Sequence, residues 1–305
     1  MNTPMRKSSK RHPWLAALLS LLMPGLGQFY CGAIIRCLGL LALTNAAGML
    51  VVLALVGVRL NGGLVVSCYA LSVLIYGVGV FDAFFTARRT RADYEPKDYN
   101  RWYAYLLLGL AVSAGHVFSA LYVRDNWLMP FRIPTASMYP GIWPGDQFFA
   151  TRNVYLDKDP AVGDIVAFPN PDNRSVYFIK RVIALAGDRI EIRDGVVYID
   201  DRKLEREEAS APPVRPGRIG AGGGYFFETN QGARYRVFLD ASVKSRLRNM
   251  PPMTVPQHQC FVLGDNRDNS LDSRSFGPIP IAGIVGRADF IYAPAGNWAR
   301  FGTIR

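Results

Sequence analysis

Cysteine and histidine are both scarce in this chain of 305 residues, which contains four cysteines and three histidines. Cys260 is the only cysteine outside the apolar N-terminal third, so the rest of the chain can hold neither a disulfide framework nor a Cys-x-x-Cys metal site. A Ser-His-Asp triad there would have to use His258, because the other two histidines lie in or beside apolar segments. We therefore expect no metal ion, no cofactor and a chemistry that does not depend on histidine.

The chain also lacks the combined aromatic and basic motifs that are typical of nucleic-acid-binding folds. Its formal net charge is +11, from 35 basic and 24 acidic residues. The positive excess is spread over the N-terminus, the loop at 88–101 and the last third of the chain. This spread fits contact with an anionic membrane surface, so we expect lipid as a partner and no nucleic acid.

Long apolar segments are confined to the N-terminal part of the chain. The segments 33–57, 64–87 and 103–123 are each long enough to cross the hydrocarbon core of a bilayer. An earlier segment, 14–30, has only ten apolar residues before a Pro-Gly break, and ten helical residues reach about 15 Å, half of that core. We therefore predict a membrane anchor over 1–124, with an interfacial or re-entrant segment followed by three transmembrane helices.

Basic residues predict the orientation of this anchor. They are concentrated before residue 12 and in the loop at 88–101, and such segments are retained in the cytoplasm. Three spans then place everything after residue 124 on the opposite side of the membrane. A cleaved signal peptide would also begin with basic residues, but the apolar sequence continues too far for that interpretation.

After residue 130 the apolar residues occur in short runs rich in Val, Ile, Phe and Tyr, separated by Gly-Asp, Asp-Gly and Pro-containing turns. Residues 125–305 are therefore predicted to form a mainly-β domain. Asp194-Gly195 predicts a tight hairpin, and 201–257 is interpreted as an insertion whose first part, 201–224, is polar and poorly ordered. The predicted strands are 147–151, 164–168, 176–185, 189–193, 196–199, 235–239, 260–263 and 284–292.

Two separate side chains have surroundings that could support nucleophilic chemistry. Ser137 lies in a Pro-rich stretch, 131–149, which favours a rigid irregular loop that an extended peptide could approach. Lys180 lies in a strand of mostly apolar residues, next to Arg181, and we expect one of these two cations to be buried. Burial disfavours the ammonium form and would prepare a lysine to act as a base. Each feature alone is also compatible with an ordinary surface turn or a lysine at a sheet edge.

The segment 264–274 is dense in Asp, Asn, Ser and Arg. A calcium loop is one interpretation, but the terminal Glu is missing and the glycine stands at the wrong place. The composition favours a polar network in which Asp272 pairs with Arg274 and the short hydroxyls orient their neighbours.

Four stretches of the sequence together resemble the ordered sequence boxes of bacterial type I signal peptidases (leader peptidases), a family of serine-lysine dyad endopeptidases. The boxes lie at 135–140, 163–166, 180–188 and 264–274 and extend over roughly 131–292. Residues 1–102 lie outside the resemblance, so the roles of the extra N-terminal helices and of the insertion stay open.

The resemblance implies that Ser137 is the nucleophile and Lys180 its general base. It implies an oxyanion hole made by the Ser137 amide and the hydroxyl of Thr135, where a serine is common in the family. Ser270 matches the serine that orients the lysine, and Asp272 with Arg274 matches the supporting ion pair.

Substrate positions are also implied by the resemblance. Phe131, Ile133 and Ile179 match residues that line shallow pockets for small side chains before the cleavage site. The chain departs from the family at Ala136, where glycine is usual, and at Ala186, where proline is usual; neither change removes a catalytic group.

By resemblance, the chain is a membrane-bound endopeptidase that removes N-terminal signal peptides from exported preproteins after small residues, through an acyl-enzyme. Its location would be the bacterial inner (cytoplasmic) membrane, with several spans and the catalytic domain on the periplasmic or outer face. The implied partners are signal peptides, membrane lipid and, transiently, the protein export machinery. A specialised relative that trims a few pilin or conjugation substrates and a membrane scaffold with an idle dyad are the alternatives. The spans and the lack of a DNA-binding helix pair argue against a self-cleaving repressor.

Overall fold

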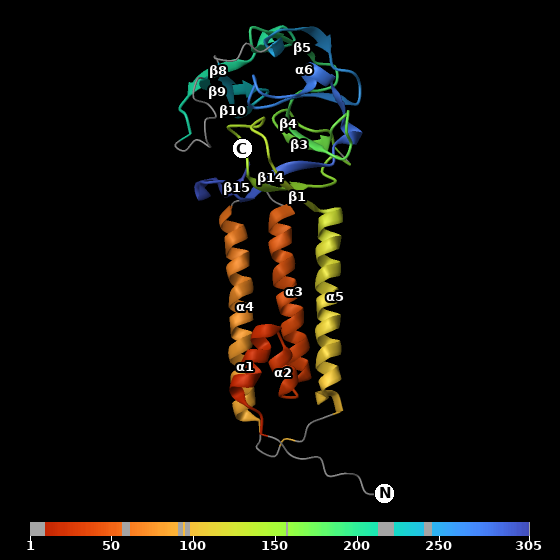
Figure 1. Cartoon of the computed structure of the whole chain (residues 1–305), viewed down its shortest axis with the longest axis vertical. Helices are drawn as coiled ribbons and strands as arrows, with labels where there is room; N and C mark the ends of the chain where they lie inside the picture. Colours follow the sequence, from red (N-terminus) through yellow and green to blue (C-terminus); the bar gives the residue numbers. More distant parts are fainter. Residues whose placement is uncertain are drawn as a thin grey trace. The chain divides into compact units, whose positions relative to one another are not determined.

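The computed structural model describes residues 10–56, 62–90, 94, 98–156, 158–212, 223–240 and 246–304. The chain divides into two compact units, residues 1–123 and 124–305, a boundary one residue from the predicted one. The first unit is helical and the second is mainly β (Figure 1). Parts of several predicted segments lie outside the described residues, namely 1–9 of the basic N-terminus, residue 57 of the first span, 91–93 and 95–97 of the basic loop, and 213–222 and 241–245 of the insertion.

Three helices of the described chain are long and apolar enough to cross a membrane. They are α3 (Ile34–Val56), α4 (Gly62–Arg89) and α5 (Trp102–Asn126), and they coincide with the three predicted spans. A 3₁₀ turn, Asp98–Asn100, precedes α5. Long apolar helices satisfy all backbone groups internally, which is what a lipid environment requires.

The predicted segment at 14–30 forms two short helices, α1 (Pro13–Leu22) and α2 (Leu26–Tyr30), which pack beside α3 and α4 (Figure 1). Polar groups in this bundle are paired with one another. The Gln28 amide donates to Gly79 O at 2.8 Å and to Asp82 at 3.0 Å, and Arg36 lies 3.3 Å from the same Asp82 carboxylate. Such pairing lets polar side chains persist among apolar helices.

The largest sheet of the second unit is antiparallel and has the order β1-β2-β14-β3-β4-β12-β13, with β15 paired to β14. Its strands are β1 (Leu128–Arg132), β2 (Gln147–Thr151), β3 (Ile165–Pro169), β4 (Tyr177–Ala184), β12 (Gln259–Leu263), β13 (Ile279–Pro280), β14 (Gly286–Ala293) and β15 (Gly302–Thr303).

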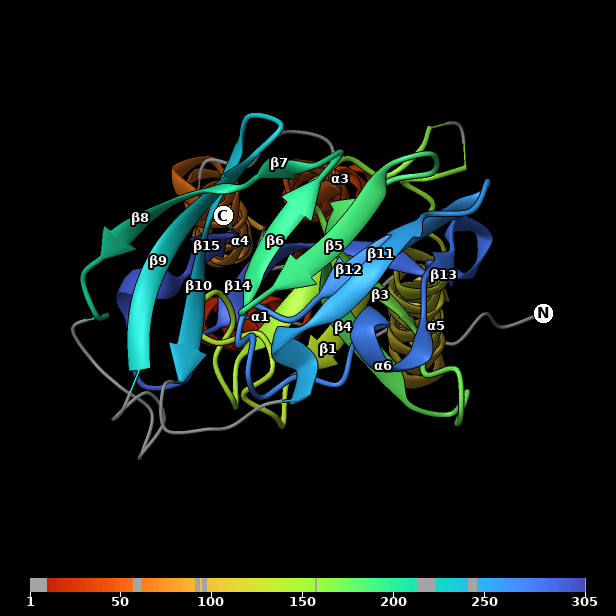
Figure 2. The ribbon, with the colours of Figure 1, turned by 90° about the horizontal axis from the view of Figure 1, so that it is seen from above.

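Two smaller antiparallel sheets, β11-β5-β6-β7 and β10-β9-β8, complete the unit (Figure 2). Their strands are β5 (Arg189–Arg193), β6 (Val196–Ile199), β7 (Arg202–Lys203), β8 (Glu205–Ala209), β9 (Gly223–Asn230), β10 (Ala233–Asp240) and β11 (Met250–Thr254). The short helix α6 (Ser273–Phe276) and the 3₁₀ turns Arg246–Arg248, Ile281–Gly283 and Trp298–Arg300 lie in the connections. We call β8, β9 and β10 the inserted sheet.

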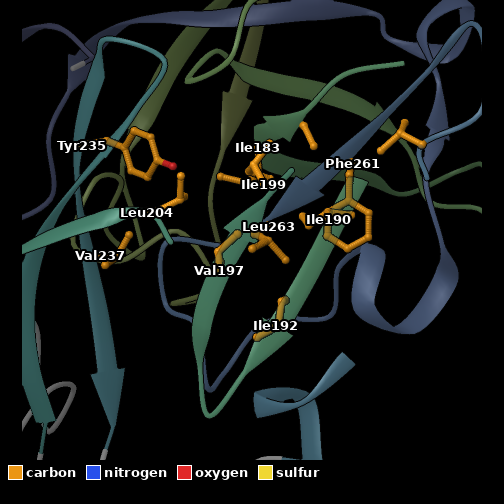
Figure 3. Close-up of a cluster of buried hydrophobic side chains, with 12 residues drawn as sticks. Ile183, Ile190, Ile192, Val197, Ile199, Leu204, Tyr235, Val237, Phe261 and Leu263 are labelled. Carbon is orange, nitrogen blue, oxygen red and sulfur yellow. The ribbon is translucent and has the colours of Figure 1, made fainter. Parts of the chain in front are cut away.

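A single cluster of buried side chains joins the three sheets (Figure 3). It receives side chains from β4 and β12 of the large sheet, from the β5–β6 hairpin, and from β10 of the inserted sheet. Because burial of each large aliphatic side chain contributes roughly 1.5–3 kcal/mol, this shared core holds the inserted sheet against the rest of the domain.

All eight predicted strands occur, with ends shifted by two residues or fewer. The Asp194-Gly195 hairpin is also confirmed: both residues have positive φ, 49° and 78°, and Arg193 pairs with Val196. The prediction of poor order was wrong for the described part of 201–224, where β7 and β8 form. Pairing of β8 with β9 supplies the backbone hydrogen bonds that its polar composition gave no reason to expect.

Candidate active site

Ser137 is half-buried in the connection between β1 and β2. The Tyr139 amide donates to Ala136 O at 3.0 Å and closes a turn around the serine, which we call the nucleophile turn (136–139). The connection is fixed at its other end by Asp146, a fully buried carboxylate that accepts from the Trp143 and Ala295 amides at 2.7 and 2.8 Å. A buried carboxylate bound by backbone amides holds a loop in one geometry.

Lys180 reaches Ser137 from β4. Its Nζ lies 3.0 Å from Ser137 Oγ and 3.1 Å from Ile179 O, and the lysine is only 3% exposed. Burial lowers the pKa of Lys180 to about 8, although the carboxylates of Asp272 and Asp265 oppose this shift. The sequence predicted a lowered pKa, and the physical cause is the predicted one, loss of solvation in an apolar strand.

Arg181, the next residue, is also 3% exposed, so both cations of the pair are buried, where one was expected from the sequence. Its guanidinium makes two hydrogen bonds to Asp265, at 2.7 and 2.8 Å, and a third to Gly163 O at 2.7 Å. A bidentate carboxylate offsets the desolvation of the guanidinium. The sequence could not show that a partner 84 residues away would make a second buried cation possible.

The segment 264–274 lies directly against the nucleophile turn. The Asn266 amide donates to Ser137 O at 3.1 Å, and its side chain donates to Ala136 O at 3.2 Å. Gly264 permits this approach, because a Cβ at that position would lie 2.6 Å from Ser137 O. The segment therefore fixes the backbone of the serine as well as its surroundings.

Asp272 and Arg274 form the predicted ion pair, with two hydrogen bonds of 2.8 Å. The Asp272 carboxylate also accepts from the Gly264 amide at 3.0 Å. Ser270 lies beside Gly264, but its buried Oγ makes no hydrogen bond in the described part of the chain. The hydrogen bond to Lys180 that the resemblance implied is therefore not formed in this structure.

Two further donors lie close to Ser137 Oγ, namely the hydroxyl of Thr135 and the amide of Ser137 itself. Thr135 is exposed, and its Oγ1 lies 3.3 Å from Ser137 Oγ. Within the described residues, the Ser137 amide donates to no acceptor. An uncommitted amide and a nearby hydroxyl can both donate to an oxygen that develops negative charge beside the serine.

Phe131, Ile133 and Ile179 come together in one apolar cluster, which also contains Met138, the residue after the serine. Ile133 and Ile179 are buried, and Phe131 packs against the Tyr177 ring at a centroid distance of 5.6 Å. The cluster is close to the nucleophile because β1 leads directly into its turn.

The edge of β4 beside the serine is paired with β12 only as far as Arg181, and the carbonyl of Ile179 accepts from Lys180 Nζ. Val182 bonds toward β3, since its amide donates to Asp164 O and its carbonyl accepts from Gly163 N. By alternation, the backbone groups of Ile179 and Arg181 face the other side, where β12 ends opposite Arg181. In the described structure no strand pairs with Ile179 on this side, so the Ile179 amide is the group with which an extended peptide could pair.

Sequence reasoning did not identify the functions of Asn266, Asp265 or Asp146. The first two lie inside the polar segment that the sequence did single out, so the density of Asp and Asn was a usable signal. Asp146 had no such signal, because its partners Ala295 and Arg300 are distant in the chain.

The family model described as "Signal peptidase, peptidase S26" matches residues 104–293. The chain belongs to this family. Membership of the family makes the chain a peptidase, and its homologues together with its apolar helices make it a membrane-associated protein.

Relatives of this signal peptidase carry the same description. The chain is 34% identical to "Signal peptidase I" of Rickettsia typhi, over 57% of this chain and 75% of that protein. It is also 34% identical to "Probable signal peptidase I-1" of a Synechocystis species, over 60% of this chain and 81% of that protein. The chain is also similar to a signal peptidase I from Enterococcus faecalis whose crystal structure is known, with 29% sequence identity and a TM-score of 0.26. The match covers 43% of this chain and 97% of the crystallised chain.

Proposed function

We propose that this signal peptidase cleaves N-terminal signal peptides from exported preproteins after small residues, with Ser137 as nucleophile and Lys180 as general base. The observation that carries the proposal is the 3.0 Å contact between Lys180 Nζ and Ser137 Oγ within a site where the lysine is buried. A base whose pKa is about 8 is neutral in a useful fraction of molecules near neutral pH.

In the acylation step the Ser137 hydroxyl proton moves first to Lys180 and then to the leaving amine. Neutral Lys180 Nζ accepts the Ser137 hydroxyl proton while Oγ attacks the scissile carbonyl carbon, and the carbonyl oxygen becomes an oxyanion. The tetrahedral intermediate collapses, the C–N bond breaks, and Nζ returns the proton to the leaving amine. The acyl-enzyme ester is then hydrolysed by water, which Lys180 deprotonates in the same way.

Neighbouring groups would support these steps. The Ser137 amide and Thr135 Oγ1 are assigned to the oxyanion. Asp272 and Arg274 hold the 264–274 segment against the serine. Ser270, whose buried hydroxyl has no partner in the described residues, is available to orient Lys180 during proton transfer.

The substrate is assigned to the free edge of β4, as an extended peptide that pairs with the Ile179 backbone. Its side chains next to the scissile bond would enter the apolar cluster of Phe131, Ile133 and Ile179, which favours small residues such as alanine. Substrates with a bulky residue just before the scissile bond should therefore be poor, and efficient cleavage of such a substrate would contradict the pocket assignment.

The proposed location is the bacterial inner membrane, with α3, α4 and α5 as spans and the catalytic domain on the periplasmic face. The length and apolarity of the three helices support this topology, together with the basic residues Arg88 and Arg89 at the end of α4. Lipid and, transiently, the export machinery are the proposed partners. A periplasm-dependent reporter fused after residue 130 should be active; an inactive fusion would overturn the topology.

The direct test of the dyad uses the full chain purified in detergent, incubated with a preprotein. Ser137→Ala and Lys180→Ala should each abolish cleavage. Matched controls are Ser175→Ala and Lys203→Ala, the same changes at exposed positions outside the site, which should leave the rate unchanged. Wild-type cleavage by either dyad variant would refute the assignment.

A further inference from the structure

Four aromatic side chains meet behind the nucleophile turn: Tyr139, Trp143, Tyr225 and Phe238. Tyr139 is fully buried, and its hydroxyl oxygen lies 2.8 Å from the hydroxyl oxygen of Tyr225. Its ring packs at 6.0 Å from the Tyr225 ring and 5.8 Å from the Phe238 ring, in edge-to-face geometry. Tyr225 and Phe238 belong to β9 and β10, so this contact joins the inserted sheet to the turn.

Tyr139 is well placed to control the serine. It follows Ser137 by two residues, and its own amide closes the turn by donating to Ala136 O at 3.0 Å. A displacement of the Tyr139 side chain therefore moves the backbone that carries Ser137 Oγ. Catalysis is sensitive to such displacements, because reacting groups must be held within a fraction of an ångström.

The inserted sheet is itself anchored by bonds that do not involve the turn. The buried Glu228 carboxylate on β9 pairs with Arg267 and with Arg206. On β10, the Phe238 amide donates to Asp265 O at 2.9 Å, and Phe238 O accepts from the Arg267 amide at 3.0 Å. The opposite face of β10 places Tyr235 and Val237 in the shared core (Figure 3). A rigidly held strand pair thus presents the Tyr225 hydroxyl to Tyr139.

We propose that the inserted sheet holds the nucleophile turn in its reactive geometry, and that Tyr225 is a positioning residue that acts on Ser137 through Tyr139. This inference rests on the proposed function, since it assigns a role within the same reaction. Ring packing alone fills the space between sheet and turn, whereas the hydroxyl pair fixes the direction from which Tyr139 is held. The hydrogen bond therefore sets the position of the turn, and the rings set its stability.

The experiment compares Tyr225→Phe, Tyr139→Phe and the double variant, each of which keeps the rings and removes the hydroxyl pair. Each variant removes the hydroxyl pair and keeps the ring contacts, so thermal stability should fall only slightly in all three. Tyr198→Phe on β6 is the matched control, because Tyr198 is a half-buried tyrosine remote from the turn.

The kinetic readout separates positioning from stability. With the full chain and a preprotein substrate, kcat should fall about 5- to 30-fold in all three variants, while KM stays within about twofold. The double variant should be no slower than either single, since all three lose the same bond.

Unchanged kcat in Tyr225→Phe would overturn the inference, and so would recovery of kcat in the double variant. Either result would leave the dyad intact as long as Ser137→Ala stays inactive. Activity of Ser137→Ala would instead refute the proposed function itself.

Discussion

Lys180 and Arg181 are neighbours on β4, point to opposite faces of the strand, and are equally buried, yet their surroundings differ in one respect. Arg181 is bound by both oxygens of Asp265, whereas the hydrogen bonds of Lys180 within the described residues go to Ser137 Oγ and the carbonyl of Ile179. The arginine thus keeps a full charge and fastens the 264–274 segment to the sheet. In the described part of the chain no carboxylate makes an ion pair with the lysine, so burial outweighs the more distant Asp272 and Asp265 and lowers its pKa to about 8, which suits a base. The presence or absence of a carboxylate partner, and not burial itself, separates the structural cation from the reactive one.

The largest effect is expected from Lys180→Arg, which would make the two positions alike. Arginine cannot lose its proton in a protein, so the base would be lost although the positive charge stays. We expect kcat/KM for preprotein cleavage to fall by about 1,000-fold or more. Lys203→Arg, the same change at an exposed site, is the control and should have no effect. Substantial activity in Lys180→Arg would show that this position does not supply the base.

Arg181→Met tests whether the buried ion pair between Arg181 and Asp265 stabilises the fold. It leaves the buried Asp265 carboxylate without its partner, and breaking a buried ion pair costs about 3–5 kcal/mol of unfolding free energy. The loss should appear as a lower thermal midpoint of the β unit in detergent. Arg234→Met breaks the exposed pair with Glu207, and about 0–1 kcal/mol is expected there. Equal losses in the two variants would mean that burial of the Arg181 pair is unimportant.

Lys180→Met should act in the opposite direction. The folded pKa of about 8 lies below the ordinary value of 10.5, so the unfolded chain binds the proton more tightly than the folded chain. The wild type therefore gains stability as pH rises from about 8 to 10.5, and at pH 7 the charged lysine costs roughly 3 kcal/mol. Replacing the lysine with methionine should therefore raise the thermal midpoint at pH 7. The loss of the two Nζ hydrogen bonds makes this gain smaller. The gain should vanish above about pH 10.5, and a gain that persists there would have another cause.

Local sequence signals were sufficient for some elements and not for others. The apolar helices and the Asp194-Gly195 hairpin follow from hydrophobic length and turn chemistry, which are properties of neighbouring residues. Of the inserted sheet only β10 was predicted; β9, which carries Glu228, was not, because it is stabilised by Arg267 and Arg206, both remote in sequence.

The residues of the candidate site likewise differ in whether the sequence could identify them. The sequence and its resemblance identified Ser137, Lys180 and the Asp272 ion pair as candidates, but not the aromatic contact through Tyr225, which depends on how separate sheets pack. Ser270 is a candidate whose implied contact with Lys180 is not formed, since sequence position cannot specify a side-chain rotamer.

The most direct test of the lysine's role is the pH dependence of kcat/KM for the full chain with a preprotein. If neutral Lys180 is the base, the rate should rise about tenfold per pH unit and level off near pH 8, where half of the lysine is neutral. A rate that rises without levelling until pH 10, as an ordinary exposed lysine would give, or a rate that is flat from pH 6 to 9, would contradict the account.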